Sequence, residues 1–259
     1  MLTNRVLLFD SHLHIVDPRF PLVANQGFVP APFTVADYRR RMAGYRLAGG
    51  AVVSGSFQAF DQQYLLDALR RLGPTFVGVT QLPATVSDAQ LLALHRAGVR
   101  ALRFNLQRGG SAGLHELDRL ARRVHEVAGW HVELYADASD LAELLPTLIE
   151  LPAVSVDHLG LSRRGLRTLV RLVQFGVRVK ATGFGRVDFD VRHALRELVA
   201  ANPEAVLFGS DLPSTRAPRP YADADVGLIV DTIGEADAAR VLCDNALQWY
   251  RVCEHPVSA

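Results

Sequence analysis

The first predicted strand of this chain is Val6-Leu7-Leu8-Phe9, and the sequence continues directly as Asp10-Ser11-His12-Leu13-His14. The four apolar residues form a short run that is typical of a buried β-strand. Because side chains alternate along an extended chain, His12 and His14 point to the same side. The pair alone is equally compatible with a structural role, so its meaning depends on the other polar residues that the fold brings near it.

Seven further apolar runs have the length of a strand, and segments that favour helices lie between them. The predicted strands are 51–53, 76–79, 99–106, 131–136, 154–158, 177–182 and 206–211. The predicted helices are about 34–47, 61–72, 87–97, 114–128, 139–151, 162–176 and 190–201, followed by two that begin near 222 and 235. Strands that alternate with helices imply parallel βαβ units, and eight such units predict an α/β fold of the (β/α)₈ TIM-barrel type.

Local signals place the ends of these elements. Thr34 is a predicted N-cap, Gly49-Gly50 is expected to break the helix before the second strand, and Ser139 is expected to open a later helix. The alternative fold is an open doubly wound sheet, which usually carries a Gly-rich phosphate turn after its first strand. This chain has Ser11-His12-Leu13-His14 at that place, so we favour a TIM barrel formed as a single domain by residues 1–259.

Length and composition agree with one large domain. The chain has 259 residues, of which 49% are hydrophobic, and a net charge of +1, a balance that does not favour a nucleic-acid partner. No apolar run approaches the roughly 20 residues that span a bilayer, and Asp10 arrives before a secretion signal could finish. Cys243 and Cys253 lack metal-type spacing. We expect a cytoplasmic protein without a membrane partner; its oligomeric state stays open, with a homodimer as one option.

Polar residues stand at or just beyond most of the predicted strand ends, which is where (β/α)₈ barrels carry their catalytic groups. In chain order they are His12, His14, Ser56, Arg103, Arg108, Tyr135, His158, Arg186 and Asp211. A carboxylate that follows the apolar run 206–208 needs a reason to be there. Arginines are rarely buried unless paired, although Arg103 could simply pair with a carboxylate in the barrel wall. We expect these nine side chains to meet at one opening.

Two chemistries fit His12, His14 and Asp211. In the first, they bind Zn²⁺ or Mn²⁺ and leave an open position for water. In the second, no cofactor is present: Asp211 acts as a general base toward water and the histidines polarise a substrate carbonyl. A catalytic metal calls for a further strong ligand, and the end of the fifth strand offers only Tyr135, with Asp137 beyond it.

Several motifs resemble the amidohydrolase superfamily, and within it the branch that contains 2-pyrone-4,6-dicarboxylate lactonase. Two of the motifs are Asp10-Ser11-His12-Leu13-His14 and the strand-eight segment Phe208-Gly209-Ser210-Asp211-Leu212-Pro213. Of these, only the His-x-His pair and the strand-eight aspartate are shared with the whole superfamily. The more specific segments are Arg103-Phe104-Asn105, Trp130-His131-Val132 and Lys180-Ala181-Thr182, and Val156-Asp157-His158-Leu159-Gly160 also matches.

This resemblance implies a barrel hydrolase that opens a lactone ring without needing a divalent metal. It implies that Asp211 activates the water and that His12, His14 and His158 surround the scissile carbonyl. The positions that match substrate-holding residues of the branch are Ser56, Arg103, Tyr135 and Arg186, with Arg108 as the basic residue beyond the fourth strand.

The chain departs from the branch at three places. Leu161 stands where the branch has an arginine, Gln58 stands where it has a histidine, and Gly109-Gly110 follow Arg108 where it has a further arginine. Because two substrate carboxylates call for bidentate arginines, the substrate is either the dicarboxylate pyrone or a related lactone with one carboxylate. A metal-dependent hydrolase or decarboxylase and a barrel that only binds a carboxylated small molecule are the other two hypotheses.

Overall fold

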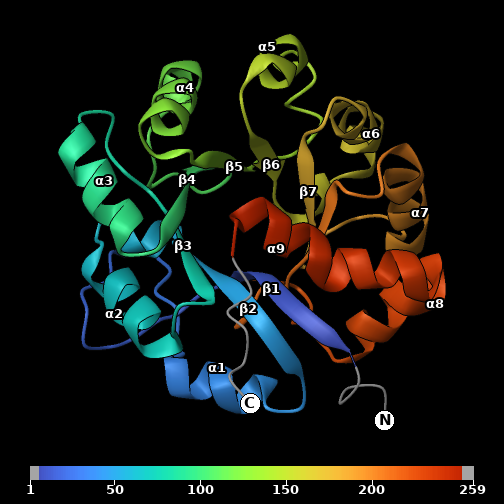
Figure 1. Cartoon of the computed structure of the whole chain (residues 1–259), viewed down its shortest axis with the longest axis horizontal. Helices are drawn as coiled ribbons and strands as arrows, with labels where there is room; N and C mark the ends of the chain where they lie inside the picture. The colour runs from blue at the N-terminus through green and yellow to red at the C-terminus, as the bar shows by residue number, and fades with distance from the viewer. Residues whose placement is uncertain (1–5, 253–259) are drawn as a thin grey trace.

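The structure is a computed structural model that describes residues 6–252, and it is a barrel of parallel strands inside a ring of helices (Figure 1). The eight strands of the described chain follow one another around the sheet in sequence order, and each pairs in parallel with the next. They are β1 Leu7–Leu13, β2 Arg46–Val53, β3 Phe76–Thr80, β4 Val99–Asn105, β5 His131–Tyr135, β6 Val154–Val156, β7 Arg178–Ala181 and β8 Val206–Phe208. The predicted (β/α)₈ barrel is confirmed.

The ends of β8 and β1 meet and close the ring on one side. The Asp211 backbone N–H donates to the His12 carbonyl at 2.7 Å, and the His14 N–H donates to the Leu212 carbonyl at 2.7 Å. A parallel bridge joins Leu13 to Leu212. These bonds fix the carboxyl end of β1 against the carboxyl end of β8.

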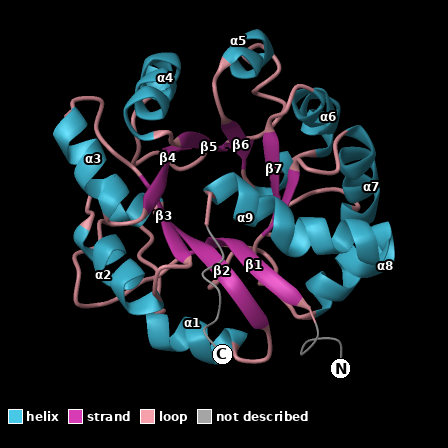
Figure 2. Ribbon diagram, viewed as in Figure 1, coloured by secondary structure: helices cyan, strands magenta, loops and turns pink. Residues whose placement is uncertain are grey.

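Helices form the outer layer (Figure 2). They are α1 Val35–Met42, α2 Gln63–Leu72, α3 Asp88–Arg96, α4 Leu117–Ala128, α5 Leu145–Glu150, α6 Leu166–Gln174, α7 Val191–Ala201, α8 Ala224–Ala239 and, after a π-helical segment at Arg240–Asp244, α9 Asn245–Tyr250. None of these helices within residues 6–252 is both long and apolar enough to cross a membrane.

Two apolar layers hold the barrel together. The larger one lies between the strands and the helices, and the smaller one fills the barrel from inside. Helix α9 packs against the smaller one, because the ring of Tyr250 stacks on Phe9 with centroids 5.5 Å apart. Tyr250 also donates to Glu133 at 2.7 Å. Helix α9 therefore covers the end of the barrel at which the strands begin, as its contacts near the start of β5 show. The polar residues at the carboxyl ends of the strands lie at the other end of the barrel.

Gly49-Gly50 do not break a helix, as the sequence suggested; they lie inside β2, and α1 already ends at Met42. A Cβ atom on Gly49 would lie 2.2 Å from the Thr75 carbonyl oxygen, and one on Gly50 would lie 2.8 Å from the Phe76 ring. The glycines are therefore needed because a neighbouring segment packs directly on the strand.

The helix predicted to open at Ser139 is also wrong in its start, since α5 begins at Leu145. The Ser139 backbone N–H and hydroxyl both donate to one oxygen of Asp137, at 2.8 Å each. Ser139 therefore closes a local turn around Asp137 and does not cap the helix.

We predict that Gly49→Ala lowers the free energy of unfolding by about 1–3 kcal/mol, because the new methyl group overlaps backbone that cannot move freely. The matched control is Gly44→Ala, where no other atom lies within 4 Å of the added Cβ, and it should change stability by less than about 0.5 kcal/mol. Urea unfolding of the three proteins measures both values. Equal stability of the two variants would contradict the packing argument.

Candidate active site

The nine predicted site residues do meet at the carboxyl end of the barrel. A cavity with about 400 Å³ of unfilled space opens there. Seven of the nine residues line it: His14, Ser56, Arg103, Arg108, Tyr135, His158 and Arg186. The other two, His12 and Asp211, are fully buried next to its lining residues. Strand ends from around the barrel therefore contribute to one site.

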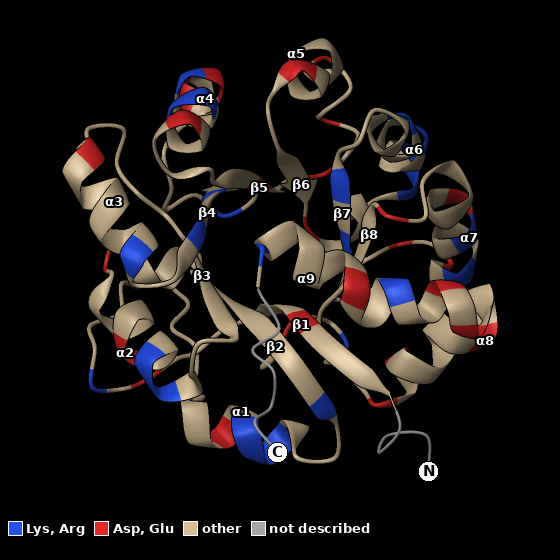
Figure 3. Ribbon diagram, in the orientation of Figure 1, with Lys and Arg blue, Asp and Glu red and all other residues tan. Residues whose placement is uncertain are grey.

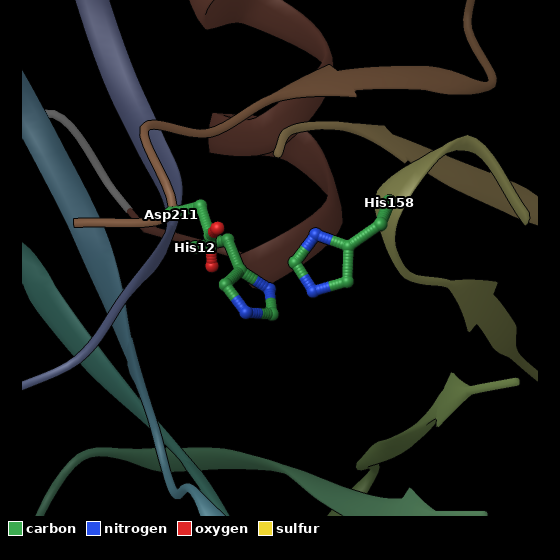
Figure 4. Close-up of side chains that lie close together, drawn as sticks. All are labelled: His12, His158 and Asp211. Atoms are coloured by element: carbon green, nitrogen blue, oxygen red, sulfur yellow. The ribbon is translucent and has the colours of Figure 1, made fainter. Parts of the chain in front are cut away.

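Three side chains form the floor of this site: His12 from β1, His158 from the segment after β6 and Asp211 from the segment after β8 (Figure 4). One ligand atom from each lies within 4.8 Å of the other two. His12 Nε2, His158 Nδ1 and Asp211 Oδ1 have no hydrogen-bond partner among the described residues. Buried polar atoms without a partner are rare in proteins, so this group is arranged to meet something other than the protein itself.

The Asp211 carboxylate is held in one orientation. Arg186 Nε donates to its Oδ2 at 2.7 Å, and its Oδ1 lies 3.7 Å from His14 Nε2. Burial by itself would raise the pKa of Asp211, but the Arg186 guanidinium outweighs it and holds that pKa well below its usual value. Asp211 is therefore an ionised carboxylate at neutral pH.

His14 is oriented by β2. Its Nδ1 lies 2.7 Å from the Val53 carbonyl oxygen, and because a carbonyl can only accept, Nδ1 must carry a proton. Its other nitrogen, Nε2, is the one that faces Asp211. Val53 thus fixes which atom of the imidazole enters the site.

His12 and His158 are neutral imidazoles. Burial lowers the pKa of His12 to about 3, although the Asp157 carboxylate opposes this shift. Burial also lowers the pKa of His158 well below its usual value. Their rings lie close, with centroids 4.8 Å apart. Neither ring can carry a permanent charge at neutral pH, so both can act as polar groups toward a substrate.

A charged network below the floor supports His12. Arg103 Nη2 donates to Asp157 Oδ2 at 2.9 Å, which confirms the ion pair that was the alternative role for Arg103. Lys180 donates to Glu133 and lies 3.5 Å from His12 Nδ1. Figure 3 shows basic residues on β7, the strand that carries Lys180. All four charged side chains of this network are buried.

The sequence interpretation missed Glu133, Asp157 and Lys180 as parts of the site. Glu133 and Lys180 stand in the middle of apolar strands, and a charge in such a run needs a partner. That signal could have indicated a buried ion pair, but which strands meet across the barrel interior is settled only by the fold. The sequence also missed Arg216, which lines the same cavity.

Backbone strain marks the segments that carry the floor. His158 has φ 53° and Asp211 has φ 59°, a left-handed conformation that is uncommon for residues other than glycine. Asp10 holds the neighbouring turn, because it accepts from the Ser210 backbone N–H at 2.7 Å and from the Ser210 hydroxyl at 2.6 Å. Such strain persists where the surroundings enforce it and clusters at functional sites.

The barrel and its floor of histidines and an aspartate define a hydrolase-type site of the amidohydrolase class. Residues 9–252 match the model of the family described as Amidohydrolase, so the chain belongs to that family.

Two relatives and one solved structure show how far the likeness extends. The chain is 29% identical to a 2-pyrone-4,6-dicarboxylate hydrolase from Comamonas testosteroni, over 93% of this chain and 89% of that protein. It is 28% identical to a D-galactarolactone isomerase from Agrobacterium fabrum, over 91% and 88%. An Agrobacterium tumefaciens protein solved in its apo form has the same fold, with a TM-score of 0.81 at 22% identity over 97% and 98% of the two chains.

We predict that stability depends on pH through His12. In the unfolded chain a histidine binds a proton as the pH falls below about 6.5, whereas folded His12 stays neutral until about pH 3. The unfolded state therefore binds more protons between these values, and His12 lowers the unfolding free energy by about 1.4 kcal/mol for each unit of falling pH. His12→Asn should remove this contribution. Asp10, whose pKa burial raises to about 6, acts in the opposite direction in both proteins and cancels in their difference.

Urea unfolding of both proteins at pH 7.5, 6, 5 and 4.5 measures the effect. The difference in unfolding free energy between the two proteins at pH 7.5 gives the part of the effect of the substitution that does not depend on protonation. Parallel stability curves for the two proteins below pH 6 would show that His12 is protonated in the folded state.

Proposed function

We propose that this protein is a hydrolase that opens the ring of a carboxylated lactone by adding water to the ring carbonyl. The observation that carries the proposal is the floor of the cavity, where one ionised carboxylate, Asp211, faces the neutral imidazoles of His12 and His158. This set combines an acceptor for a proton of water with donors for a carbonyl oxygen.

The names of the relatives support a lactone as substrate. One is named as a hydrolase of 2-pyrone-4,6-dicarboxylate, which is an unsaturated cyclic ester with two carboxylates. The other is named as an isomerase of D-galactarolactone. Both names share a lactone-type ring and differ in the reaction, so the reaction must be argued from the site. We propose 2-pyrone-4,6-dicarboxylate or a related carboxylated lactone as the substrate.

Asp211 supplies the base. Arg186 occupies Oδ2, whereas Oδ1 accepts no hydrogen bond from the described residues, since its neighbour His14 Nε2 lies 3.7 Å away, and is available to a water molecule. The lowered pKa of Asp211 keeps the base form fully populated, and the water becomes acidic as its oxygen bonds to the carbonyl carbon. Arg186 holds the carboxylate still during this transfer. As the bond between the carbonyl carbon and the ring oxygen breaks, the proton taken up by Asp211 passes to the ring oxygen, which becomes a hydroxyl of the opened product.

His12 and His158 supply donors for the developing oxyanion. His12 Nδ1 faces both the Lys180 ammonium, at 3.5 Å, and Asp157 Oδ1, at 3.4 Å. We propose that Nδ1 accepts from Lys180, which puts the ring proton on His12 Nε2, the atom without a hydrogen-bond partner among the described residues. Such a donor, fixed before the reaction begins, stabilises negative charge as it forms on the carbonyl oxygen. His158, whose ring lies 4.8 Å from that of His12, is placed to provide a second donor.

The remaining predicted residues hold the substrate. Ser56 and Tyr135 line the cavity. The Tyr135 ring centroid lies 5.2 Å from the Arg103 guanidinium carbon and 4.9 Å from the centroid of the His158 ring. A flat unsaturated ring can pack against these aromatic faces. Arg108 provides positive charge for a carboxylate of the substrate.

A metal-dependent hydrolase is the second candidate, and the three unpartnered floor atoms favour it. His12, His158 and Asp211 would hold a Zn²⁺ or Mn²⁺ ion, since two imidazoles and a carboxylate are suitable ligands. His158 takes the place that the sequence had given to His14. When bound, such an ion would polarise the carbonyl and acidify the water. We prefer the reaction without a metal, because the Lys180 ammonium already stands beside His12 and would repel a second cation.

We predict that Asp211→Asn lowers turnover of 2-pyrone-4,6-dicarboxylate by about 10²–10⁴-fold, the usual contribution of a general base. The reaction is run in ¹⁸O-labelled water, because ring opening by water at the carbonyl carbon places one ¹⁸O in the new carboxylate whereas isomerisation does not. The matched control is the exposed Asp231→Asn, which should keep wild-type turnover. Unchanged turnover in Asp211→Asn, with circular dichroism that shows a folded protein, would rule out this role for Asp211.

We also predict that prolonged dialysis against EDTA or 1,10-phenanthroline leaves turnover unchanged, because the proposed chemistry uses only side chains of the protein. Elemental analysis before and after dialysis provides the control for metal removal. Loss of turnover that returns on adding Zn²⁺ or Mn²⁺ would support the metal-dependent alternative instead.

A further inference from the structure

The cavity is lined by four arginines, and they are of two kinds. Arg103 is paired with Asp157 at 2.9 Å, and Arg186 is paired with Asp211 at 2.7 Å. Within residues 6–252, no acidic side chain lies within ion-pair distance of the other two, Arg108 and Arg216. The charges of Arg103 and Arg186 are already neutralised by their aspartates. The unbalanced positive charge of the cavity therefore lies at Arg108 and Arg216.

Among the described residues, all hydrogen-bond partners of these two guanidiniums are neutral. Arg216 donates to the backbone carbonyl of Asn25 and, at 3.3 Å, to its side-chain oxygen. The Arg216 guanidinium also lies 4.3 Å from the centroid of the Phe28 ring. Arg108 donates to Gln26 Oε1 at 3.4 Å. Each guanidinium has five N–H donors, so both keep donors that these contacts do not use.

The two guanidiniums also repel each other. Burial and then the charge of Arg108 lower the pKa of Arg216, which is the effect expected of like charges that face each other without a counter-ion. Both side chains are only half-buried, whereas the floor residues are fully buried. They therefore lie toward the mouth of the cavity, on the loops that follow β4 and β8. Both loops are hydrogen-bonded to Asn25, in the segment 25–28.

We propose that Arg108 and Arg216 form an anion site at the mouth of the cavity that selects substrates with a carboxylate on the side of the ring away from the attacked carbonyl. This inference deepens the proposed function, on which the identity of the ring rests; the anion site itself rests on the two arginines alone. A carboxylate between them accepts hydrogen bonds from both and removes their repulsion. Arg216 is then a specificity-determining residue.

The test measures binding, not turnover, with probes that cannot be hydrolysed. Pyridine-2,4-dicarboxylate has its two carboxylates in the same relation as the pyrone, and pyridine-2-carboxylate and pyridine-4-carboxylate each lack one of them. Isothermal titration calorimetry of the wild-type chain should give at least tenfold tighter binding of the dicarboxylate than of either monocarboxylate. Arg216→Met should weaken dicarboxylate binding by about 10–100-fold, the usual value of hydrogen bonds to a charged group. The preference over the monocarboxylate that lacks the carboxylate at the mouth is then largely lost, because binding of that probe does not use Arg216.

Two further variants separate recognition from a merely structural role. Arg167→Met removes an exposed arginine on α6 and should keep the wild-type preference, which controls for the lost net charge. Arg216→Lys should keep part of the preference. If Arg216 only anchored the segment 25–28, Arg216→Met would weaken all three probes by the same factor and leave the preference unchanged.

Each outcome distinguishes the anion site from the proposed function. A wild-type chain without preference for the dicarboxylate, or an unchanged preference in Arg216→Met, overturns the anion site even where lactone turnover is observed. A preference that Arg216→Met abolishes supports the anion site even where no ¹⁸O enters the product, a result that would refute the hydrolase alone.

Discussion

Opposite charges paired inside the barrel are the constraint on which this site depends. Lys180 with Glu133 and Arg103 with Asp157 are buried ion pairs, and the partly buried Arg186 pairs with the buried Asp211. These pairs connect different strands or the segments after them. Such pairs contribute little net stability when compared with apolar residues, but removal of one partner leaves an uncompensated buried charge that costs about 3–5 kcal/mol. Each pair therefore fixes the relative positions of its two strands more firmly than it stabilises the fold.

The orientations of the site histidines are fixed by contacts with these ion pairs and with the backbone. His12 lies against Asp157 and Lys180, and the bond from Asp211 N–H to the His12 carbonyl joins the ends of β1 and β8 directly. His14 is oriented by Val53 on the neighbouring strand. The polar atoms of the floor that have a protein partner are oriented by it, and His12 Nε2, His158 Nδ1 and Asp211 Oδ1 have no hydrogen-bond partner among the described residues. This division explains why burial, which makes the imidazoles neutral, suits them as hydrogen-bond donors.

Much of this arrangement could be predicted from the sequence, because apolar runs at regular spacing specify the barrel and the barrel rule locates the strand ends. The errors have local causes. The two glycines Gly49-Gly50 suggested the end of a helix, whereas their role is to leave room for Thr75 and Phe76, which pack directly on the strand. This contact joins residues far apart in the sequence, so no local pattern predicts it. Alternation along β1 correctly placed His12 beside His14, but it could not show that His158 is the residue that joins His12 and Asp211. That contact depends on the left-handed backbone at His158.

Arg216 was beyond sequence reasoning for a related reason. It follows β8 in a segment without regular structure, and its backbone, like that of Asp211, is left-handed. No periodic pattern predicts the direction of a side chain there. The consequence is physical: residues of the floor are fixed by buried charges from the strands, whereas the mouth is built by loops whose side chains are half-buried and bonded to neutral groups. A substitution at the mouth leaves no buried charge unpaired, so we expect that this barrel can change which anion the proposed site accepts without disturbing the groups proposed to activate water.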